Sequence, residues 1–204
     1  MIESMRVERF KSFRDATLKL GPLTVIVGTN ASRKSNLRDA FRFVHGVSCG
    51  YTLAEIIGEK YVEGGVLQWK GIRGGMREVA FSGMSDFRLV ITLSPPTNEG
   101  FRLPCKLVHE IHVGVGDARS GPRVPRESLY KDDSIVFDSH PDDDPPEQEG
   151  PPYLFVRLPR DSRNRKHGKR LRFLDNQPVL SQFPEHGEAA KAYREAAKAY
   201  REAA

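Results

Sequence analysis

The chain has 204 residues, of which 38% are hydrophobic and 29% charged, and its formal net charge is +5. That length suits one domain, or one domain with an appendage. The sequence has no apolar run of about eighteen residues, which argues against a membrane span, and charges within residues 1–6 argue against a secretion signal. We therefore expect a cytoplasmic protein, whose positive charge permits a polyanionic partner without requiring one.

The first elements predicted along the chain are two short strands, 4–10 and 16–20, which are joined by a basic turn. The chain then enters a run of apolar and β-branched residues, 23–27. An uncharged run of this kind is typical of a buried, central parallel strand. A helix is predicted directly afterwards, over 35–45, because apolar residues recur there at helical spacing.

The segment between this strand and this helix, 28–35, matches the phosphate-binding pattern GxxxxGK[ST] except at Arg33, where the pattern has its second glycine. In such a loop, backbone N–H groups surround the β-phosphate and the lysine reaches the β- and γ-oxygens. The hydroxyl of Ser35 would take a Mg²⁺ position. The candidate nucleotide-binding residues are Gly28, Thr29, Asn30, Ala31, Ser32, Arg33, Lys34, Ser35 and Asn36.

Arg33 makes this loop unusual. The glycine that it replaces lies where the backbone approaches the phosphates, so a Cβ there brings a clash or an unfavourable backbone dihedral. A guanidinium is also a phosphate ligand, which leaves a second interpretation open. We expect weak or absent nucleotide binding rather than a new arginine clamp.

The glycine-rich segment 46–78 predicts a long ordered connection with one short helix, over 53–60. Beyond it, short strand-like runs are separated by Gly, Pro, Asp and Ser, which is the pattern of an antiparallel meander. The predicted strands are 78–81, 87–93, 107–115, 123–130, 134–137, 153–158 and 169–173. An acidic, proline-rich stretch, 138–152, predicts a loop without regular structure.

Two later segments have a distinctive composition. The stretch 157–172 has eight Lys or Arg and one acidic residue. It could contact the phosphates of DNA, but a solvated hairpin loop explains such a run as well, and 160–170 has no aromatic residue to stack on bases. The tail, 184–204, repeats a seven-residue unit of strong helix formers from Glu188. It predicts a C-terminal helix, on the surface or as a short coiled-coil arm.

Two segments of the sequence resemble those of AAA-type ATPases of the ABC-like branch, which includes RecF, SMC heads and OLD-type nucleases. The segments are VERFKSFRD at 7–15 and VIVGTNASRKSNL at 25–37. The resemblance implies an α/β P-loop NTPase fold, with the N-terminal lobe of an ABC-type ATPase head over 1–183. Its antiparallel β-subdomain would span 78–183, before the helical tail. The resemblance also implies ATP and Mg²⁺ as cofactors, and work in DNA maintenance or phage defence.

The same resemblance extends to residues outside the loop. Gln182 corresponds to a glutamine that touches Mg²⁺ and the attacking water, with Gln177 as the alternative and an ordinary surface glutamine as the plainer explanation. The basic turn, 11–14, would lie near the nucleotide, although its place on a solvated hairpin explains it equally well. The Asp-Glu strand (Walker B) and signature motif of the family's second lobe are missing from this sequence.

This incompleteness leaves open whether the chain hydrolyses ATP. We expect a truncated ATPase head that needs a second ATPase lobe or a homodimer, or else a relic of one. The alternative function is a non-enzymatic interaction module with a degenerate loop, in which the basic stretch or the tail binds nucleic acid or a protein partner. The histidines and the two cysteines have no metal-ligand spacing, so we expect no site of that kind.

Overall fold

The computed structural model describes residues 1–28, 33–94, 105–116, 120–139, 153–158 and 170–182. The predicted helical tail, 184–204, lies outside this part of the chain, and so does nearly all of the proline-rich stretch. Thr29, Asn30, Ala31 and Ser32 of the predicted phosphate loop also lie outside it.

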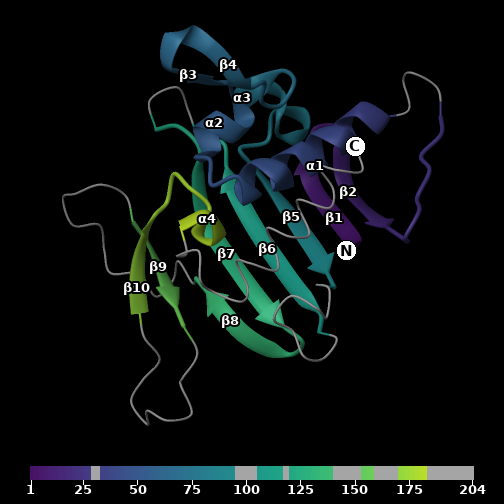
Figure 1. Cartoon of the computed structure of the whole chain (residues 1–204), viewed down its shortest axis with the longest axis vertical. Coiled ribbons are helices and arrows are strands. Elements are labelled where there is room, and N and C mark those ends of the chain that lie inside the picture. The colour runs from purple at the N-terminus through teal and green to yellow at the C-terminus, as the bar shows by residue number, and fades with distance from the viewer. Residues whose placement is uncertain (29–32, 95–104, 117–119, 140–152, 159–169, 183–204) are drawn as a thin grey trace.

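One eight-stranded sheet forms the body of the molecule (Figure 1). Its strands are β1 (Ile2–Phe10), β2 (Phe13–Lys19), β5 (Asp86–Leu93), β6 (Leu107–Gly114), β7 (Arg123–Lys131), β8 (Ser134–Asp138), β9 (Tyr153–Arg157) and β10 (Arg170–Leu174). They lie in the order β10-β9-β8-β7-β6-β5-β1-β2, and neighbouring strands are antiparallel. Because β1 pairs with β5, the first hairpin and the later meander share this sheet.

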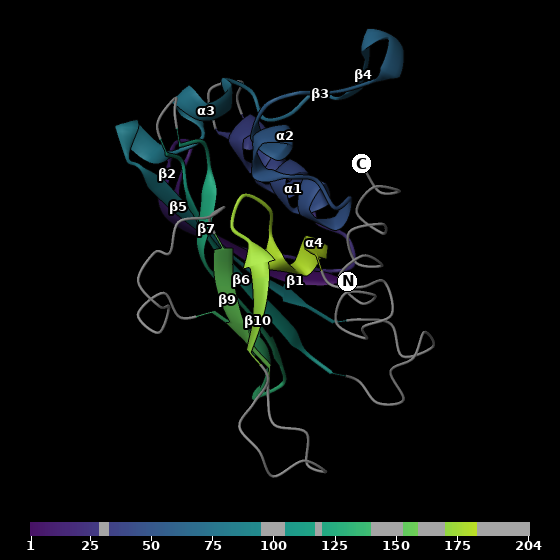
Figure 2. The ribbon, with the colours of Figure 1, turned by 90° about the vertical axis from the view of Figure 1, so that its left-hand side faces the viewer.

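Four helices and a small hairpin complete the described fold. The helices are α1 (Lys34–Ser48), α2 (Leu53–Ile57), α3 (Gly75–Glu78) and α4 (Val179–Gln182). The hairpin consists of β3 (Lys60–Val62) and β4 (Val66–Trp69), joined by the 3-10 turn η1 (Glu63–Gly65), and a second such turn, η2 (Phe81–Gly83), precedes β5. Figure 2 shows α1 and α2 on one face of the sheet, with the hairpin projecting beyond them.

The core lies between α1 and this face of the sheet. Along β5 and β6, buried side chains alternate with half-buried ones, so each strand turns one set of residues to the helices. Phe87 of β5 is the central contact. The centre of its ring lies 5.2 Å from that of Phe10 in β1 and 5.4 Å from that of Phe43 in α1, and both pairs pack edge to face. Helix and sheet are thereby packed as one unit.

A buried pair fixes α4 to the sheet. Glu127 of β7 is fully buried and accepts hydrogen bonds from the backbone N–H of Val179 at 2.6 Å and of Leu180 at 3.0 Å. His109 Nε2 of β6 lies 2.8 Å from the same carboxylate. Since buried carboxylates are costly unless they are hydrogen-bonded, this arrangement holds the first turn of α4 in place.

The opposite face of the sheet is polar, and a row of ion pairs crosses it near the β2 edge. The row runs through Asp15, Arg6, Glu8, Arg88, Glu110 and His112, with N–O distances from 2.8 to 3.1 Å. The hydrogen bond from His112, followed by that from Arg88, lowers the pKa of Glu110 to about 2 against the opposing effect of burial. Solvation of one face is common in antiparallel sheets.

Two of the predicted strands are wrong. Residues 23–27 form no strand, and Leu23, Val25 and Val27 are 84%, 72% and 85% exposed. The sheet ends at β2, so this apolar run has no neighbouring strand with which to pair in the described fold. Residues 78–81 connect α3 to η2, with a single bridge from Ala80 to Phe10, because Val79 and Ala80 pack into the core instead.

The connection 46–78 contains more structure than the sequence predicted. The short helix α2 is present but ends at Ile57, before Gly58, and its N-cap Thr52 forms a capping box with Glu55. The hairpin β3–β4 follows, and Trp69 at its end packs inward and donates a hydrogen bond to the carbonyl of Ile56 at 3.1 Å. No helix in the described ranges is long and apolar enough to cross a membrane.

The depressed pKa of Glu110 predicts a pH dependence of stability. In the folded protein the pKa of Glu110, about 2, lies below the ordinary value of 4.5. The contribution of Glu110 to the free energy of unfolding is therefore present above pH 4.5 and is lost as the pH falls towards 2. Glu110→Gln removes this contribution, and we expect the variant to lose less stability than the wild type between about pH 6 and about pH 3 in urea unfolding. Asp133→Asn, in the β7–β8 turn, is the control. Equal losses in wild type and Glu110→Gln would contradict the prediction.

Candidate phosphate-binding site

The predicted phosphate loop ends at the N-terminus of α1. Arg33 precedes the helix in the left-handed region, with φ 66° and ψ 3°, and its carbonyl accepts hydrogen bonds from Asn36 N at 2.9 Å and Leu37 N at 3.2 Å. Its side chain forms no cap, and the first turn carries no acidic residue. This helix start is therefore suited electrostatically to an anion.

Lys34 connects the two ends of the loop. Its Nζ donates a hydrogen bond to the carbonyl of Gly28, the last described residue before Thr29. The ammonium group thus lies beside Gly28, where the segment 28–35 begins. Phosphate oxygens bound by the loop would compete for this same donor.

Asn36 joins the helix to the turn between β1 and β2. Its Nδ2 donates to Ser12 Oγ at 2.7 Å, and its Oδ1 accepts from Arg73 Nη2 at 3.0 Å. The structure therefore places the basic turn, 11–14, beside the first turn of α1.

A buried carboxylate lies beneath this contact. Asp39 is fully buried, and Arg73 binds it through Nη2 at 2.8 Å and Nε at 3.0 Å. Lys11 Nζ lies 4.0 Å from the same carboxylate and donates to the carbonyl of Arg73. Burial lowers the pKa of Lys11, and the nearby Asp39 opposes that shift. Four cationic residues, Lys11, Arg33, Lys34 and Arg73, thus surround the start of α1.

Sequence reasoning missed Asp39 and Arg73 as members of this site. They are 34 residues apart, and no local pattern pairs them. Arg73 offers a weak signal, since it is a cation directly before Gly74-Gly75 in the connection between β4 and α3.

Ser35 and Gln182, the two predicted Mg²⁺ ligands, are not brought together. Ser35 lies in the first turn of α1, whereas Ser181, next to Gln182, donates to the carbonyl of Val47 in the last turn. The 15 residues of α1 separate these ends by about 20 Å. Gln182 instead pairs through its amide with the backbone N–H and carbonyl of Leu174, at 2.9 and 2.7 Å.

Gln177, the alternative, also lies at the far end of α1, where its Nε2 donates to the carbonyl of Gly50 at 2.9 Å. Within the described ranges, no group of three or more His, Cys, Asp or Glu residues could hold a metal ion. A Mg²⁺ ion at the loop would therefore rely on the Ser35 hydroxyl, on oxygens of the nucleotide and on water, which this ion commonly retains.

Comparisons with known proteins establish no family. No family model matches the chain, and no curated protein matches it. A search of solved structures finds a chain described as "Structural biochemistry of ATP-driven dimerization and DNA stimulated activation of SMC ATPases". It is 21% identical, the match covers 66% of this chain and 70% of that one, and the TM-score is 0.35. A likeness at this TM-score carries no argument for fold or function.

The left-handed backbone at Arg33 predicts an unusual effect of glycine. The left-handed conformation costs a residue with a Cβ about 1–2 kcal/mol. Arg33→Gly should therefore raise the free energy of unfolding by about 1 kcal/mol and the Tm by a few degrees. Arg38→Gly, in the same helix and exposed, should lower it by about 1 kcal/mol. Thermal and urea unfolding measure both changes. A loss of stability in Arg33→Gly comparable to that in Arg38→Gly would contradict the assigned backbone.

Proposed function

We propose that residues 28–36 bind the phosphates of ATP with Mg²⁺ at the start of α1, and that this chain alone does not complete a hydrolytic site. The observation that carries the proposal is the position of Lys34, whose ammonium bonds to Gly28 at a helix N-terminus without a side-chain cap. Motif and geometry thereby point to the same ligand chemistry.

Each residue has a specific role in this proposal. Lys34 exchanges the Gly28 carbonyl for β- and γ-phosphate oxygens, and Ser35 offers its hydroxyl to Mg²⁺. Asn36 is a positioning residue, because its contacts with Ser12 and Arg73 hold the first turn of α1. Arg33 supplies further positive charge, but its backbone lies in the left-handed region, which is strained for a residue with a Cβ.

We infer that the chain alone does not hydrolyse ATP from the missing Asp-Glu strand and from the state of Asp39 at the same end of α1. Asp39 is the buried carboxylate there, and it is bound by Arg73 beneath the surface, where it cannot polarise an attacking water. The proposed partner is a second ATPase lobe or a second copy of this chain. The exposed segment 23–27 supports a second lobe, since an uncharged β-branched run is what a central parallel strand would offer.

The proposed biological setting, DNA maintenance or phage defence, comes from the sequence resemblance at 7–15 and 25–37 alone. The alternative is an interaction module in which the loop is degenerate. The two proposals differ in whether Lys34 matters for binding a nucleotide.

Calorimetric titration with Mg-ATP tests the proposal. We expect weak binding by the wild type and binding about tenfold tighter in Arg33→Gly, because loss of the Cβ and long side chain lets the backbone approach the phosphates more closely. A gain of about 1.4 kcal/mol in the bound state corresponds to a factor of ten. Lys34→Ala in the Arg33→Gly background should abolish this binding. Arg38→Ala, which removes an exposed cation from the same helix, should leave it unchanged.

Two results would overturn the proposal. One is a lack of binding by Arg33→Gly at millimolar Mg-ATP, with the protein shown to be folded. The other is equal affinity with and without the Lys34 side chain, which would favour the interaction module.

A further inference from the structure

The two strands at the far edge of the sheet carry an unusual surface. In the β9–β10 register, Arg170 lies opposite Arg157, and Arg172 lies opposite Phe155. Directly opposed residues share a face of an antiparallel pair, so these four side chains and Tyr153 lie on the same face. The alternate residues of β9, Leu154 and Val156, are buried in the core, which leaves the arginine face toward solvent.

On this face, guanidinium groups stack on aromatic rings. The Cζ of Arg170 lies 4.1 Å from the centre of the Phe155 ring. The Cζ of Arg172 lies 4.5 Å from the Tyr153 ring and 5.6 Å from the Phe155 ring. A guanidinium stacked on a ring is pre-organised, because the ring restricts its rotamers without using its N–H groups.

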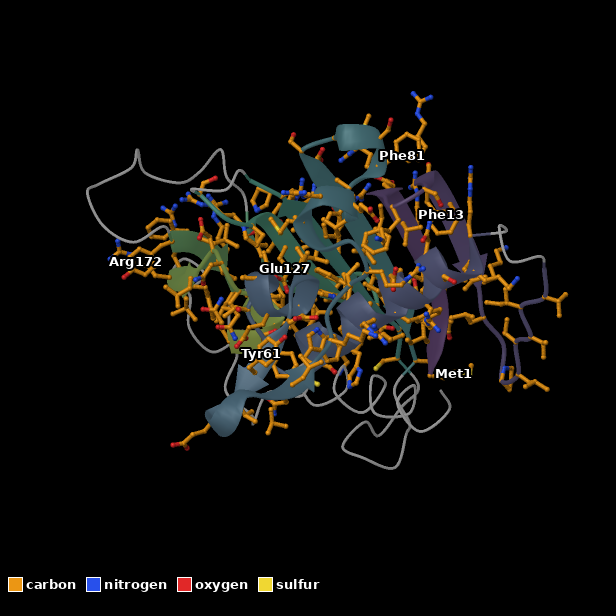
Figure 3. The ribbon with its side chains drawn as sticks, turned by 90° about the horizontal axis from the view of Figure 1, so that it is seen from above. Met1, Phe13, Tyr61, Phe81, Glu127 and Arg172 are labelled. Carbon is orange, nitrogen blue, oxygen red and sulfur yellow. The ribbon has the colours of Figure 1, made fainter. Side chains whose placement is uncertain are left out.

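The charge of this surface differs from that of the rest of the open face. Near the β2 edge, acids and bases alternate in ion pairs, whereas every charged residue of β9 and β10 is an arginine. Figure 3 shows Arg172 at the opposite end of the molecule from Phe13 of β2. Asp138 of β8 lies across from Arg157, so the positive charge is strongest towards Arg170 and Arg172.

We propose that this surface, made of Tyr153, Phe155, Arg157, Arg170 and Arg172, binds single-stranded nucleic acid. Arginine N–H groups would contact phosphates, and the ring-backed guanidinium planes would receive unstacked bases. A duplex hides its base faces, and the carboxylates of an acidic peptide carry no aromatic rings to stack, so neither uses both parts of the surface. The proposal is independent of ATP binding at α1, which lies on the other face of the sheet.

Fluorescence anisotropy with a labelled oligo-dT of about 15 nucleotides, over a series of salt concentrations, tests the proposal. We expect Arg172→Ala to weaken binding about tenfold and to make the slope of log K against log salt shallower by about 0.7, the value for one phosphate contact on a single strand. Arg172→Lys should keep the wild-type slope but still bind more weakly, because an ammonium has no plane for stacking.

Arg6→Ala is the matched control, since Arg6 is an exposed arginine on the same face of the sheet near the β2 edge. It should bind like the wild type. Circular dichroism shows whether each variant is folded, and Arg172→Lys keeps the test decisive if Arg172→Ala does not fold.

Four results would overturn the proposal. They are a lack of oligo-dT binding by the wild type at low salt, equal effects of Arg172→Ala and Arg6→Ala, tighter binding of a duplex of the same length, and equal competition by polyglutamate. The last two would assign the surface to duplex DNA or to an acidic protein partner instead.

Discussion

The contact between Asp39 and Arg73 is the constraint on which the candidate site depends. A fully buried carboxylate is tolerated only when it is paired and hydrogen-bonded, and removal of its partner leaves an uncompensated buried charge. Here the partner comes from the connection after β4, and Lys11 from the turn after β1 adds a second cation. The start of α1 is thereby held against two segments that are distant in sequence. Asn36, one turn before Asp39, is aligned by the same guanidinium.

A second buried carboxylate serves the far end of α1 in a similar way. Glu127 holds α4, and Ser181 of α4 donates to the carbonyl of Val47 near the end of α1. Between these two anchors, Phe87 of the sheet packs against Phe43 of the helix. The helix is therefore fixed at both ends and in the middle, so Lys34 and Ser35 at its start lie on a rigid support. The segment that leads into the loop, 23–27, is exposed and lacks such support.

The sequence predicted the parts of the fold that local pattern determines. Short strand-like runs separated by Gly, Pro, Asp and Ser located the strands from β5 to β10, and helical spacing located α1. The prediction of a strand over 23–27 is wrong because apolar, β-branched composition indicates a preference for burial, while a strand also needs a neighbour. The hairpin β3–β4 has a local signal in the sequence, since Gly64-Gly65 lies between two apolar runs. The Asp39–Arg73 and His109–Glu127 pairs join distant segments, so no single-sequence pattern could reveal them.

The central claim is that phosphate groups bind where the loop meets α1, and amide chemical-shift mapping by NMR tests it most directly. On addition of Mg-ADP to the Arg33→Gly protein, we expect the largest shifts in residues 28–37, with smaller ones at Lys11 and Ser12 in the adjoining turn. Residues of β9 and β10 should not respond, because they lie at the opposite edge of the sheet. Shifts confined to β9–β10, or an unchanged spectrum at millimolar nucleotide, would contradict the claim.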